Sequence, residues 1–451
     1  MFDLDPRARW HDGAPVTAHD VVFTWDLANS PRLKIADRAR LDPIAGVEAV
    51  GERSVRVRFK QPGLEQVYTF GFLIQPLPSH LLEKLAPEAI PTSDYARHPI
   101  GDGPFRFERR VPGQLVELRA DSTFFLGRPT ISRLLIQTVT NPDARLNAFL
   151  TGEVDILDNI PQPALVQVQQ YAEARVIDGA SNVLVYLMFN PRSPADSTKP
   201  HPLFADPRVR EALILALDRP SIAHVTYGPS ARVPDAAQSQ LWGWITPGGI
   251  TSRPANVARA RALLSEAGWR DANGDGILDR NGVPLSFSVM YGNTNSPANT
   301  IGLQVQQMFR AIGVDLRLDR VEGAVVGQRI MNGQWDMVYA RRTQDPTPSS
   351  LVQSWSCESA RRPGSTNAAH WCDAAFDRLY ATAITAKNQP AAWHAALDRM
   401  ASQYPAIFIA APSNPIAVHR RFDNVIIWPS RTWLSLWQWR VRPDAALARD
   451  R

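Results

Sequence analysis

Lysine is scarce in this sequence, although the chain is basic. Lysine and arginine together number 49 against 44 aspartate and glutamate residues, a net charge of +5, yet only five of the basic residues are lysine. The arginines alternate with acidic residues, and no basic run is long enough to follow a nucleic-acid backbone. The composition therefore argues against nucleic acid as a partner.

Long hydrophobic runs are also missing. A membrane-spanning helix needs roughly 18 consecutive apolar residues, and the longest candidate here, residues 183–189, has only the length of a strand. The opening residues, Met-Phe-Asp-Leu-Asp, supply neither the basic stretch nor the apolar stretch of a signal peptide. Taken alone, these features predict a cytoplasmic protein without a membrane-spanning helix.

Catalytic sequence patterns are absent. The chain has no Gly-x-Ser-x-Gly, no His-Glu-x-x-His and no Walker loop, and Gly-Asp-Gly at residues 101–103 is too short for a dinucleotide fingerprint. The nine histidines are scattered. We therefore expect no enzyme, no catalytic residues, no cofactor and no metal site. A Ser-His-Asp triad assembled from distant segments has no sequence pattern and stays open at this point.

One segment resembles part of a calcium-binding loop. Residues 271–279 place acidic or amide side chains at positions one, three, five and nine, with glycine at position six, as an EF-hand does. The twelfth position, where a bidentate glutamate belongs, is Gly282. Asx turns in a plain hairpin produce the same pattern, and we favour the turn over the metal site.

Cysteine is nearly absent. The two residues, Cys357 and Cys372, are separated by fourteen others, and no Cys-x-x-Cys spacing for a metal or redox site occurs. The intervening segment is rich in glycine, proline and serine, like a surface loop. We predict a disulfide that closes this loop in an oxidising compartment, with two unrelated buried thiols as the alternative.

What is present points to a mixed α/β protein. Residues 54–59 and 114–119 alternate apolar and polar side chains like half-exposed strands, whereas residues 183–189 are apolar throughout. The length of 451 residues corresponds to two to four folding units.

Two amphipathic helices stand out between the strands. The first covers residues 209–219 and is opened by Asp206-Pro207, an N-cap followed by proline. The second covers residues 299–312, ends at Gly313 and runs into a strand at residues 314–318. A helix, a glycine and a strand in this order are typical of a βαβ layer.

Several different motif-like segments are spread along nearly the whole chain. They include Trp-His-Asp-Gly at residues 10–13, Pro-Ile-Gly-Asp-Gly-Pro-Phe at residues 99–105 and Gly-Glu-Val-Asp-Ile at residues 152–156. Further matches lie at residues 189–190, 204–212, 216–219, 262–269 and 333–336. In this order they resemble the peptide/nickel-type solute-binding proteins of ABC importers, the dipeptide- and oligopeptide-binding family.

The resemblance implies an α/β, two-lobed periplasmic-binding-protein-like fold (type II) with an extra subdomain on lobe one. By family analogy this subdomain covers residues 1–98, lobe one residues 99–190, lobe two residues 191–415, and residues 416–451 return to lobe one. Asn190 and residues 419–422 would be the crossings. Family members begin with a signal sequence and early strands upstream of the His-Asp-Gly motif, so we expect this chain to lack that start.

The resemblance also implies a ligand site after the strand that begins near Asp336. Peptide-binding members place there an aspartate that pairs with the ligand's α-ammonium. Counting from Asp336 gives Asp345, whereas counting from the following proline gives Arg342; we favour Asp345. The family's Gly-Trp is replaced by Arg341-Arg342, which removes an aromatic platform and adds positive charge. The candidate ligand residues are Asp345, Arg342, Arg341, Tyr339 and Asn190. The alternative is that both arginines are solvated and Asp345 caps a turn.

The function implied by the resemblance is capture of a peptide or peptide-like solute between the lobes and delivery to an ABC importer. The expected partners are this ligand and the importer's permease subunits, with the protein a monomer, either periplasmic or a cell-surface lipoprotein. A binding protein for a sugar, a metal chelate or an anion, or a periplasmic sensor or chaperone, is the alternative.

Overall fold

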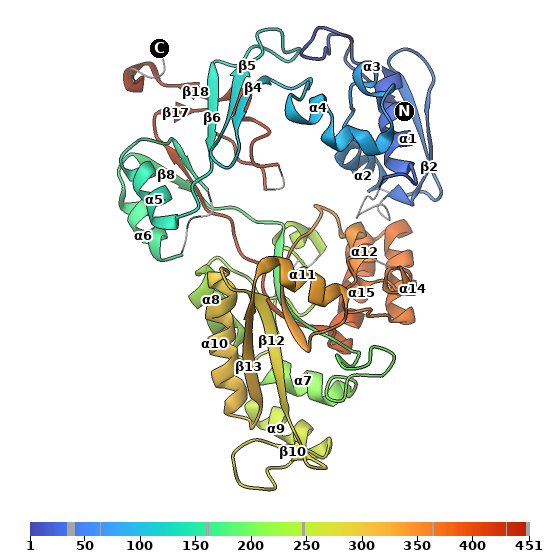
Figure 1. Cartoon of the computed structure of the whole chain (residues 1–451), viewed down its shortest axis with the longest axis vertical. Coiled ribbons are helices and arrows are strands. Elements are labelled where there is room, and N and C mark those ends of the chain that lie inside the picture. The colour runs from blue at the N-terminus through green and yellow to red at the C-terminus, as the bar shows by residue number, and fades with distance from the viewer. Residues whose placement is uncertain are drawn as a thin grey trace. The chain divides into compact units, whose positions relative to one another are not determined.

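The computed structural model divides the chain into two compact units (Figure 1). Unit 1 comprises Met1–Asp178 and Pro415–Arg451, and unit 2 comprises Gly179–Asn414. The structure describes residues 1–33, 41–63, 65–158, 160, 162–245, 249–362, 365–429 and 431–447. Across these ranges, no helix combines the length and the apolar character needed to cross a membrane.

Unit 2 is organised around a five-stranded sheet of order β13-β12-β14-β9-β15. Strands β12, β13 and β14 are parallel to one another, and β9 runs antiparallel to both β14 and β15. The strands of unit 2 are β9 (Val183–Phe189), β10 (Asp279–Arg280), β11 (Val283–Pro284), β12 (Ser286–Gly292), β13 (Asp315–Val321), β14 (Met337–Thr343) and β15 (Ala406–Ala410).

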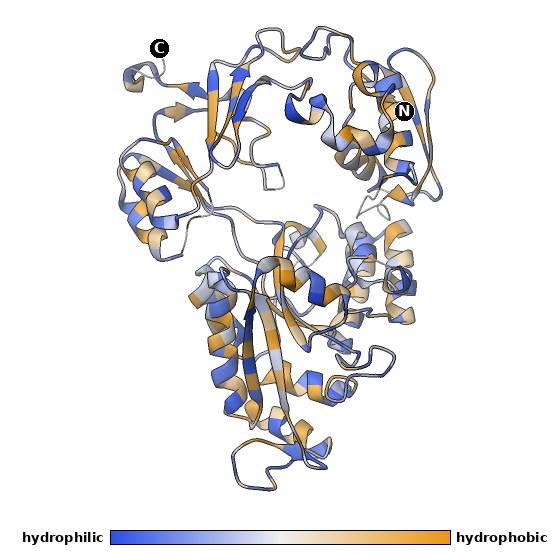
Figure 2. Cartoon of the chain, in the orientation of Figure 1, coloured by the Kyte–Doolittle hydropathy of each residue, from blue (hydrophilic) through white to orange (hydrophobic). Residues whose placement is uncertain are grey.

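Helices cover both faces of this sheet. They are α7 (Pro207–Leu215), α8 (Arg219–Tyr227), α9 (Val257–Glu266), α10 (Ser296–Arg310), α11 (Gly323–Met331), α12 (Leu351–Trp355), α13 (Cys357–Arg361), α14 (Ala374–Thr385) and α15 (Gln389–Gln403), with the 3-10 turns η3 (Gln240–Ile245) and η4 (Pro348–Ser350). In Figure 2 these helices carry both hydrophobic and hydrophilic residues. All residues of β9 and β15, in contrast, are buried.

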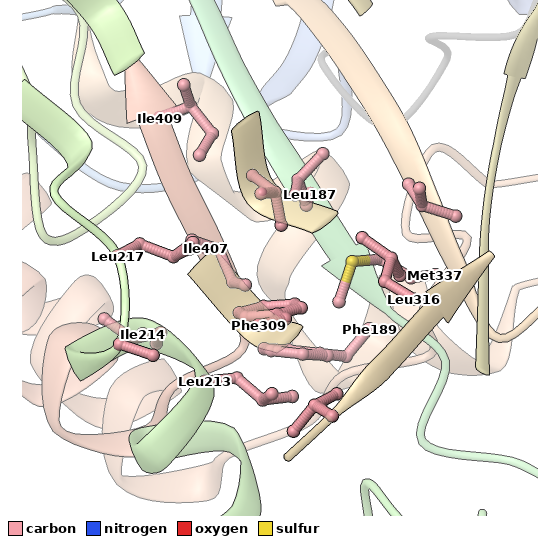
Figure 3. Close-up of a cluster of buried hydrophobic side chains, with 14 of the residues drawn as sticks. Leu187, Phe189, Leu213, Ile214, Leu217, Phe309, Leu316, Met337, Ile407 and Ile409 are labelled. Carbon is pink, nitrogen blue, oxygen red and sulfur yellow. The ribbon is translucent and has the colours of Figure 1, made fainter. Parts of the chain in front are cut away.

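The uniformly apolar strand β9 is explained by its place in the sheet. All seven of its residues are buried, because successive side chains point into different cores. Leu187 and Phe189 pack with Phe309 of α10 on the face covered by α7 to α10 (Figure 3). Tyr186 and Met188 pack on the other face, against α12, α14 and α15. The predicted strand at residues 183–189 is confirmed.

Helix starts in unit 2 follow their sequence signals. Asp206 accepts a 2.9 Å hydrogen bond from Arg208 N, with Pro207 at the first helical position, as predicted. The helix expected to reach Arg219, however, ends at Leu215. A second helix begins at Arg219 because the Asp218 side chain caps Ser221 N at 3.1 Å.

Gly313 lies in the turn between α10 and β13 for a steric reason. Its φ of +80° lies in the left-handed region, and an added Cβ would lie 2.7 Å from Leu278 Cγ. The chain therefore turns from α10 into β13 at a position that only glycine fits. The predicted helix, glycine and strand are confirmed, with bounds Ser296–Arg310 and Asp315–Val321.

Unit 1 contains several small sheets. Their orders are β1-β3-β2, β4-β5-β6, β7-β16-β8 and β17-β18. The strands are β1 (Phe2–Asp3), β2 (Ile44–Ala49), β3 (Ser54–Phe59), β4 (Phe105–Val111), β5 (Leu115–Ala120), β6 (Arg133–Gln137), β7 (Ile156–Leu157), β8 (Ala174–Ile177), β16 (Ile416–His419), β17 (Phe422–Asp423) and β18 (Arg440–Val441). The helices are α1 (Ala18–Asn29), α2 (Gln66–Leu73), α3 (Ser79–Leu82), α4 (Asp94–Arg97), α5 (Pro142–Leu150) and α6 (Gln162–Gln170), with the 3-10 turns η2 (Pro87–Thr92), η5 (Leu436–Gln438) and η6 (Pro443–Ala445).

Two motifs that are distant in the sequence meet in unit 1. The His11 ring donates from Nε2 to the carbonyl of Gly103 at 2.9 Å, and its Nδ1 accepts from Gly101 N at 3.3 Å. The backbone amide of His11 donates to Gly101 O at 2.7 Å. The Trp-His-Asp-Gly and Gly-Asp-Gly segments are thus joined by hydrogen bonds.

Asp20 is a buried carboxylate that joins three segments of unit 1. It is 2% exposed, and its oxygens accept hydrogen bonds from the side chains of Trp10, Thr17 and Ser79, at 3.3, 3.1 and 2.6 Å. The backbone amides of Thr17 and Ser79 add bonds of 2.8 and 2.9 Å. These donors outweigh the opposing effect of burial and lower the pKa of Asp20.

The chain passes between the two units at Asp178/Gly179 and at Asn414/Pro415. The second crossing lies one residue from the expected start of the return segment at residue 416, whereas the expected crossings at Asn190 and residues 419–422 lie inside unit 2 and unit 1. Asn190 lies inside unit 2, at the end of β9, and the proline-rich segment after it folds back there through a 2.8 Å bond from His201 N to Pro191 O. The C-terminal segment belongs to unit 1 because β16 pairs with both β7 and β8.

Candidate functional site

The carboxyl ends of the parallel strands form the candidate site in unit 2. In open α/β sheets, ligands bind outside the carboxyl ends of the strands. Strands β12, β13 and β14 end here at Gly292, Val321 and Thr343. Polar side chains collect at this edge: the Asn293 amide, for example, donates to Glu322 Oε1 at 2.6 Å.

Strand β14 sends its two arginines to opposite faces of the sheet. Side chains alternate along a strand, so Arg341 shares a face with the buried Tyr339, and Arg342 shares a face with Val338. Arg342 is half-buried, donates to Thr366 O at 3.3 Å and faces the buried Tyr186 hydroxyl. Arg341 is exposed, and within the described ranges its guanidinium takes part in no hydrogen bond or ion pair.

A pair of tyrosine hydroxyls lies next to Arg341. The Tyr227 and Tyr339 hydroxyl oxygens are 3.1 Å apart, and the Asn295 side chain also hydrogen-bonds Tyr339. Burial raises the pKa of both phenols, and the Arg341 guanidinium works in the opposite direction. Both phenols are therefore neutral donors at physiological pH. Sequence analysis missed Tyr227 and Asn295, since neither lies in a motif that marks a ligand site.

Asp345 follows the strand in a segment whose backbone is held in place. The backbone N–H of Gln344 donates to Asn182 O at 2.6 Å, and the indole Nε1 of Trp242 donates to the Asp345 carbonyl at 2.8 Å. Trp242 is fully buried, whereas Asp345 is half-buried. The carboxylate is thus attached to a fixed backbone at the same edge of the sheet as Arg341.

Asn190, the fifth predicted ligand residue, lies apart from the others. Its Nδ2 donates to Gly333 O at 3.2 Å and to Trp335 O at 2.8 Å, in the segment that leads into β14. Its Oδ1 accepts from Arg192 N at 3.0 Å, and the residue is 3% exposed. Asn190 therefore marks the amino end of β14, where its amide is used by the backbone, and we do not retain it in the proposed site.

The predicted disulfide between Cys357 and Cys372 is confirmed. The segment it closes is not all loop, because α13 occupies Cys357–Arg361; residues 363 and 364 lie outside the described ranges. Inside it, Asn367 is 1% exposed and donates to the carbonyls of Ser356 and Trp371 at 3.1 and 2.8 Å. Because Thr366 O accepts from Arg342, this stapled segment contacts the end of β14 directly.

The calcium-like segment at residues 271–279 has the hydrogen bonds of an Asx turn. Asp271 accepts from Gly274 N at 2.7 Å and from Gly276 N at 3.0 Å, and Asp275 accepts from Ile277 N at 2.7 Å. In the part of the chain that the structure describes, no three His, Cys, Asp or Glu side chains converge as metal ligands would.

Comparison with known proteins decides the family. Residues 1–362 match the bacterial extracellular solute-binding proteins, family 5. The chain belongs to this family. It is 25% identical to the oligopeptide-binding protein AppA of Bacillus subtilis over 448 residues, which cover 96% of the chain and 78% of AppA. It is 30% identical over 353 residues to a putative ABC transporter peptide-binding protein of Brucella ovis, covering 76% of the chain and 63% of that protein.

Solved structures of other proteins have a closely similar fold. AppA of Bacillus subtilis in complex with a nonapeptide matches with a TM-score of 0.83 and 23% identity, over 97% of the chain and 86% of AppA. NikZ of Campylobacter jejuni in complex with Ni(L-His) matches with a TM-score of 0.82 and 21% identity, over 97% and 87%. The expected α/β fold of the type II periplasmic binding proteins is confirmed.

Several residues of the family 5 motifs have structural roles in this chain. Arg219 is 2% exposed and donates to Asp235 Oδ1 at 2.5 Å and to Phe408 O at 3.1 Å, which ties α8 to β15. In unit 1, Asp155 Oδ1 accepts from Arg421 Nε at 2.8 Å, which ties the segment before β7 to the one after β16. These buried contacts hold each unit together.

Proposed function

We propose that this family 5 protein captures a peptide or peptide-like solute and delivers it to an ABC importer. The observation that carries the proposal is that an acidic and a basic side chain, Asp345 and Arg341, both lie at the carboxyl end of β14. The name of AppA as an oligopeptide-binding protein supports the peptide assignment. A metal chelate, as in NikZ, is the alternative ligand.

Asp345 is the proposed anchor for the ligand's amino terminus. A carboxylate on a fixed backbone binds an α-ammonium by charge-assisted hydrogen bonds, which are about twice as strong as neutral ones. The Trp242 bond to its carbonyl keeps the position of Asp345 defined before the ligand arrives. A site prepared in this way loses less conformational freedom on binding.

Capture needs no covalent chemistry. Ligand binding shifts the protein toward the form that the permease recognises, and the solute leaves unchanged. A serine, a histidine and an aspartate do meet in unit 2, but Asp336 lies between the other two. It is 3.2 Å from His201 Nε2 and 2.9 Å from Ser288 Oγ. Ser288 thus has a carboxylate rather than an imidazole as its partner, which is not the order of a catalytic triad.

We further propose that the protein works outside the cytoplasm as a monomer, either free in the periplasm or lipid-anchored at the cell surface. The disulfide supports an oxidising compartment, because such bonds form and persist mainly there. The permease subunits of the importer are the proposed protein partners.

The test is calorimetric titration of the full chain and its Asp345→Asn variant with trialanine and with N-acetyl-trialanine. We expect Asp345→Asn to weaken trialanine binding by roughly 2–5 kcal/mol and to leave the weak binding of the acetylated peptide unchanged. Asp423→Asn, an exposed charge on β17 in unit 1, is the matched control and should bind like the wild type. Equal affinity of the Asp345→Asn variant and the wild type for trialanine would contradict the amine anchor.

A further inference from the structure

One small sheet in unit 1 has an apolar face that is incompletely packed. Strands β4, β5 and β6 form this sheet (Figure 1), in which Leu118 of β5 pairs with Phe107 of β4 and with Leu134 of β6. Directly paired residues lie on the same face of a sheet. All three side chains are only half-buried, and none belongs to a hydrophobic core of the described residues.

A β-bulge places an arginine on this apolar face. The register between β4 and β5 shifts between Phe107 and Arg109. As a result, Arg109 pairs with Glu117 on the opposite face, where its Nε donates to the buried carboxylate at 2.7 Å. Arg110 pairs with Val116 on the apolar face instead. It is exposed, and among the described residues its guanidinium has no hydrogen-bond or ion-pair partner.

A cavity of about 530 Å³ is lined by this face and by the segment from Ala96 to Gly101. The volume falls in the range of roughly 300–1,000 Å³ that is typical of small-molecule sites. The His11 ring also lines the cavity, but its two nitrogens are already bonded to Gly101 N and Gly103 O. The sheet supplies an apolar wall, which consists of Phe105, Phe107, Leu115, Val116 and Leu118.

The charged groups of the cavity wall are positive. Arg97 and Arg110 line the cavity, whereas none of its described lining residues is an aspartate or a glutamate. Arg97 is engaged by Asp94, with 3.6 Å between Nη2 and Oδ1. Asp102 lies outside the lining, and burial raises its pKa, which favours the uncharged carboxyl group. Arg110 is therefore the cation that attracts an anion to this apolar cavity.

We propose that this cavity binds a free fatty-acid-like molecule, a hydrocarbon chain that ends in a carboxylate. The chain packs on Phe107, Val116 and Leu118, which removes apolar surface of both molecules from water. The carboxylate pairs with Arg110, because the N–H groups of a guanidinium match its two oxygens. The site goes beyond the proposed function, since it lies wholly in unit 1 and the proposed peptide anchor lies in unit 2.

The test is calorimetric titration of the full chain, in excess trialanine, with three ten-carbon probes below the concentrations at which they aggregate. The probes are decanoate, 1-decanol and decyltrimethylammonium. We expect decanoate to bind on the order of tenfold more tightly than 1-decanol, the effect of one charge-assisted pair. The cationic probe should bind most weakly, because it places a positive charge beside two arginines. Octanoate should bind on the order of tenfold more weakly than decanoate, because two fewer methylenes are buried. Equal affinity for decanoate and decyltrimethylammonium would overturn the proposal.

Two variants separate the contribution of the charge from that of the apolar wall. Arg110→Met should lower the affinity for decanoate to that for 1-decanol and leave 1-decanol binding unchanged. Leu118→Gln should weaken the binding of both, and circular dichroism checks that this variant is folded. The matched control is Arg119→Met, an exposed arginine of β5 on the opposite face of the same sheet, which should bind all probes like the wild type. Equal effects of Arg110→Met and Arg119→Met on decanoate would contradict the carboxylate pairing.

Two further measurements test other occupants of the apolar face. Cosedimentation with phosphatidylglycerol vesicles tests a membrane, and analytical ultracentrifugation tests a second copy of the chain; we expect neither vesicle binding nor a dimer. Vesicle binding that Arg110→Met abolishes, or a dimer that Leu118→Gln dissociates, would overturn the proposal. Decanoate binding by a chain that binds no trialanine would support the site and refute only the peptide function.

Discussion

Arg219 Nη2 lies 2.5 Å from Asp235 Oδ1, and only 2% of the arginine is exposed. The same guanidinium donates from Nη1 to Pro234 O and Phe408 O, both at 3.1 Å. One side chain therefore satisfies a carboxylate and two backbone carbonyls that come from different parts of unit 2. Its place in a family motif reflects this structural role rather than contact with a ligand.

Replacing Arg219 should lower the free energy of unfolding of unit 2. Arg219→Met removes the donor to Asp235 Oδ1 and to two carbonyls, whereas Asp235 Oδ2 keeps its 2.9 Å bond from Arg253 N. Removing one partner of a largely buried ion pair costs roughly 3–5 kcal/mol. Urea unfolding followed by circular dichroism measures the loss. Arg259→Met, which removes an exposed ion pair with Glu266, is the control and should unfold nearly like the wild type. Equal midpoints for the two variants would show that the Arg219 contacts do not stabilise the protein.

The disulfide should be complete in exported protein. Thiol titration of the denatured chain should find no free thiol, because Cys357 and Cys372 are joined. Reduction, or the double Cys→Ser variant, should lower stability by roughly 3 kcal/mol for a closed segment of this size. Two reactive thiols per chain would contradict the pairing and the oxidising compartment it supports.

Asp20 should make the stability of unit 1 depend on pH. Its pKa in the folded state is lowered, so it stabilises the fold above the pKa of the unfolded chain, and this contribution disappears as pH falls through the lower, folded-state pKa. Asp20→Asn should therefore reduce stability at pH 7, by roughly 1–3 kcal/mol, and the difference from wild type should shrink as pH falls below about 4. Thermal unfolding at pH 3 to 7 checks this. A difference that stays constant over that range would mean that the carboxylate charge is not involved.

Ligand capture should change tryptophan fluorescence without turnover. Trp242 donates its indole hydrogen to the Asp345 carbonyl, so a ligand bound at Asp345 should alter the Trp242 emission. Titration with trialanine should give a saturable change that Trp242→Phe largely removes, while chromatography recovers the peptide intact. Steady release of alanine from trialanine would instead identify an enzyme.

Much of the fold could be predicted from local sequence. The seven apolar residues of β9 predict a strand buried on both faces, and Gly313 predicts the turn between α10 and β13, because both patterns are visible in a short stretch of sequence. The glycine, proline and serine content of the segment between the cysteines likewise predicts the disulfide. These features are local, and the structure confirms them.

The unit boundaries and part of the site could not be predicted in this way. The proline-rich segment after Asn190 has the composition of a linker, yet Asn190 and His201 bind it to the residues around Asp336. The Tyr227–Tyr339 pair joins α8 to β14 across 112 positions of sequence, and no local sequence pattern predicts such a contact. Both depend on how distant segments pack.

Native mass spectrometry of the freshly purified full chain tests the central claim most directly. The account predicts that a copurifying solute is retained on the folded protein, is released unchanged on unfolding, and is a peptide or peptide-like molecule with a free amine and a carboxylate. A bound sugar or metal chelate that lacks these groups would contradict the peptide assignment.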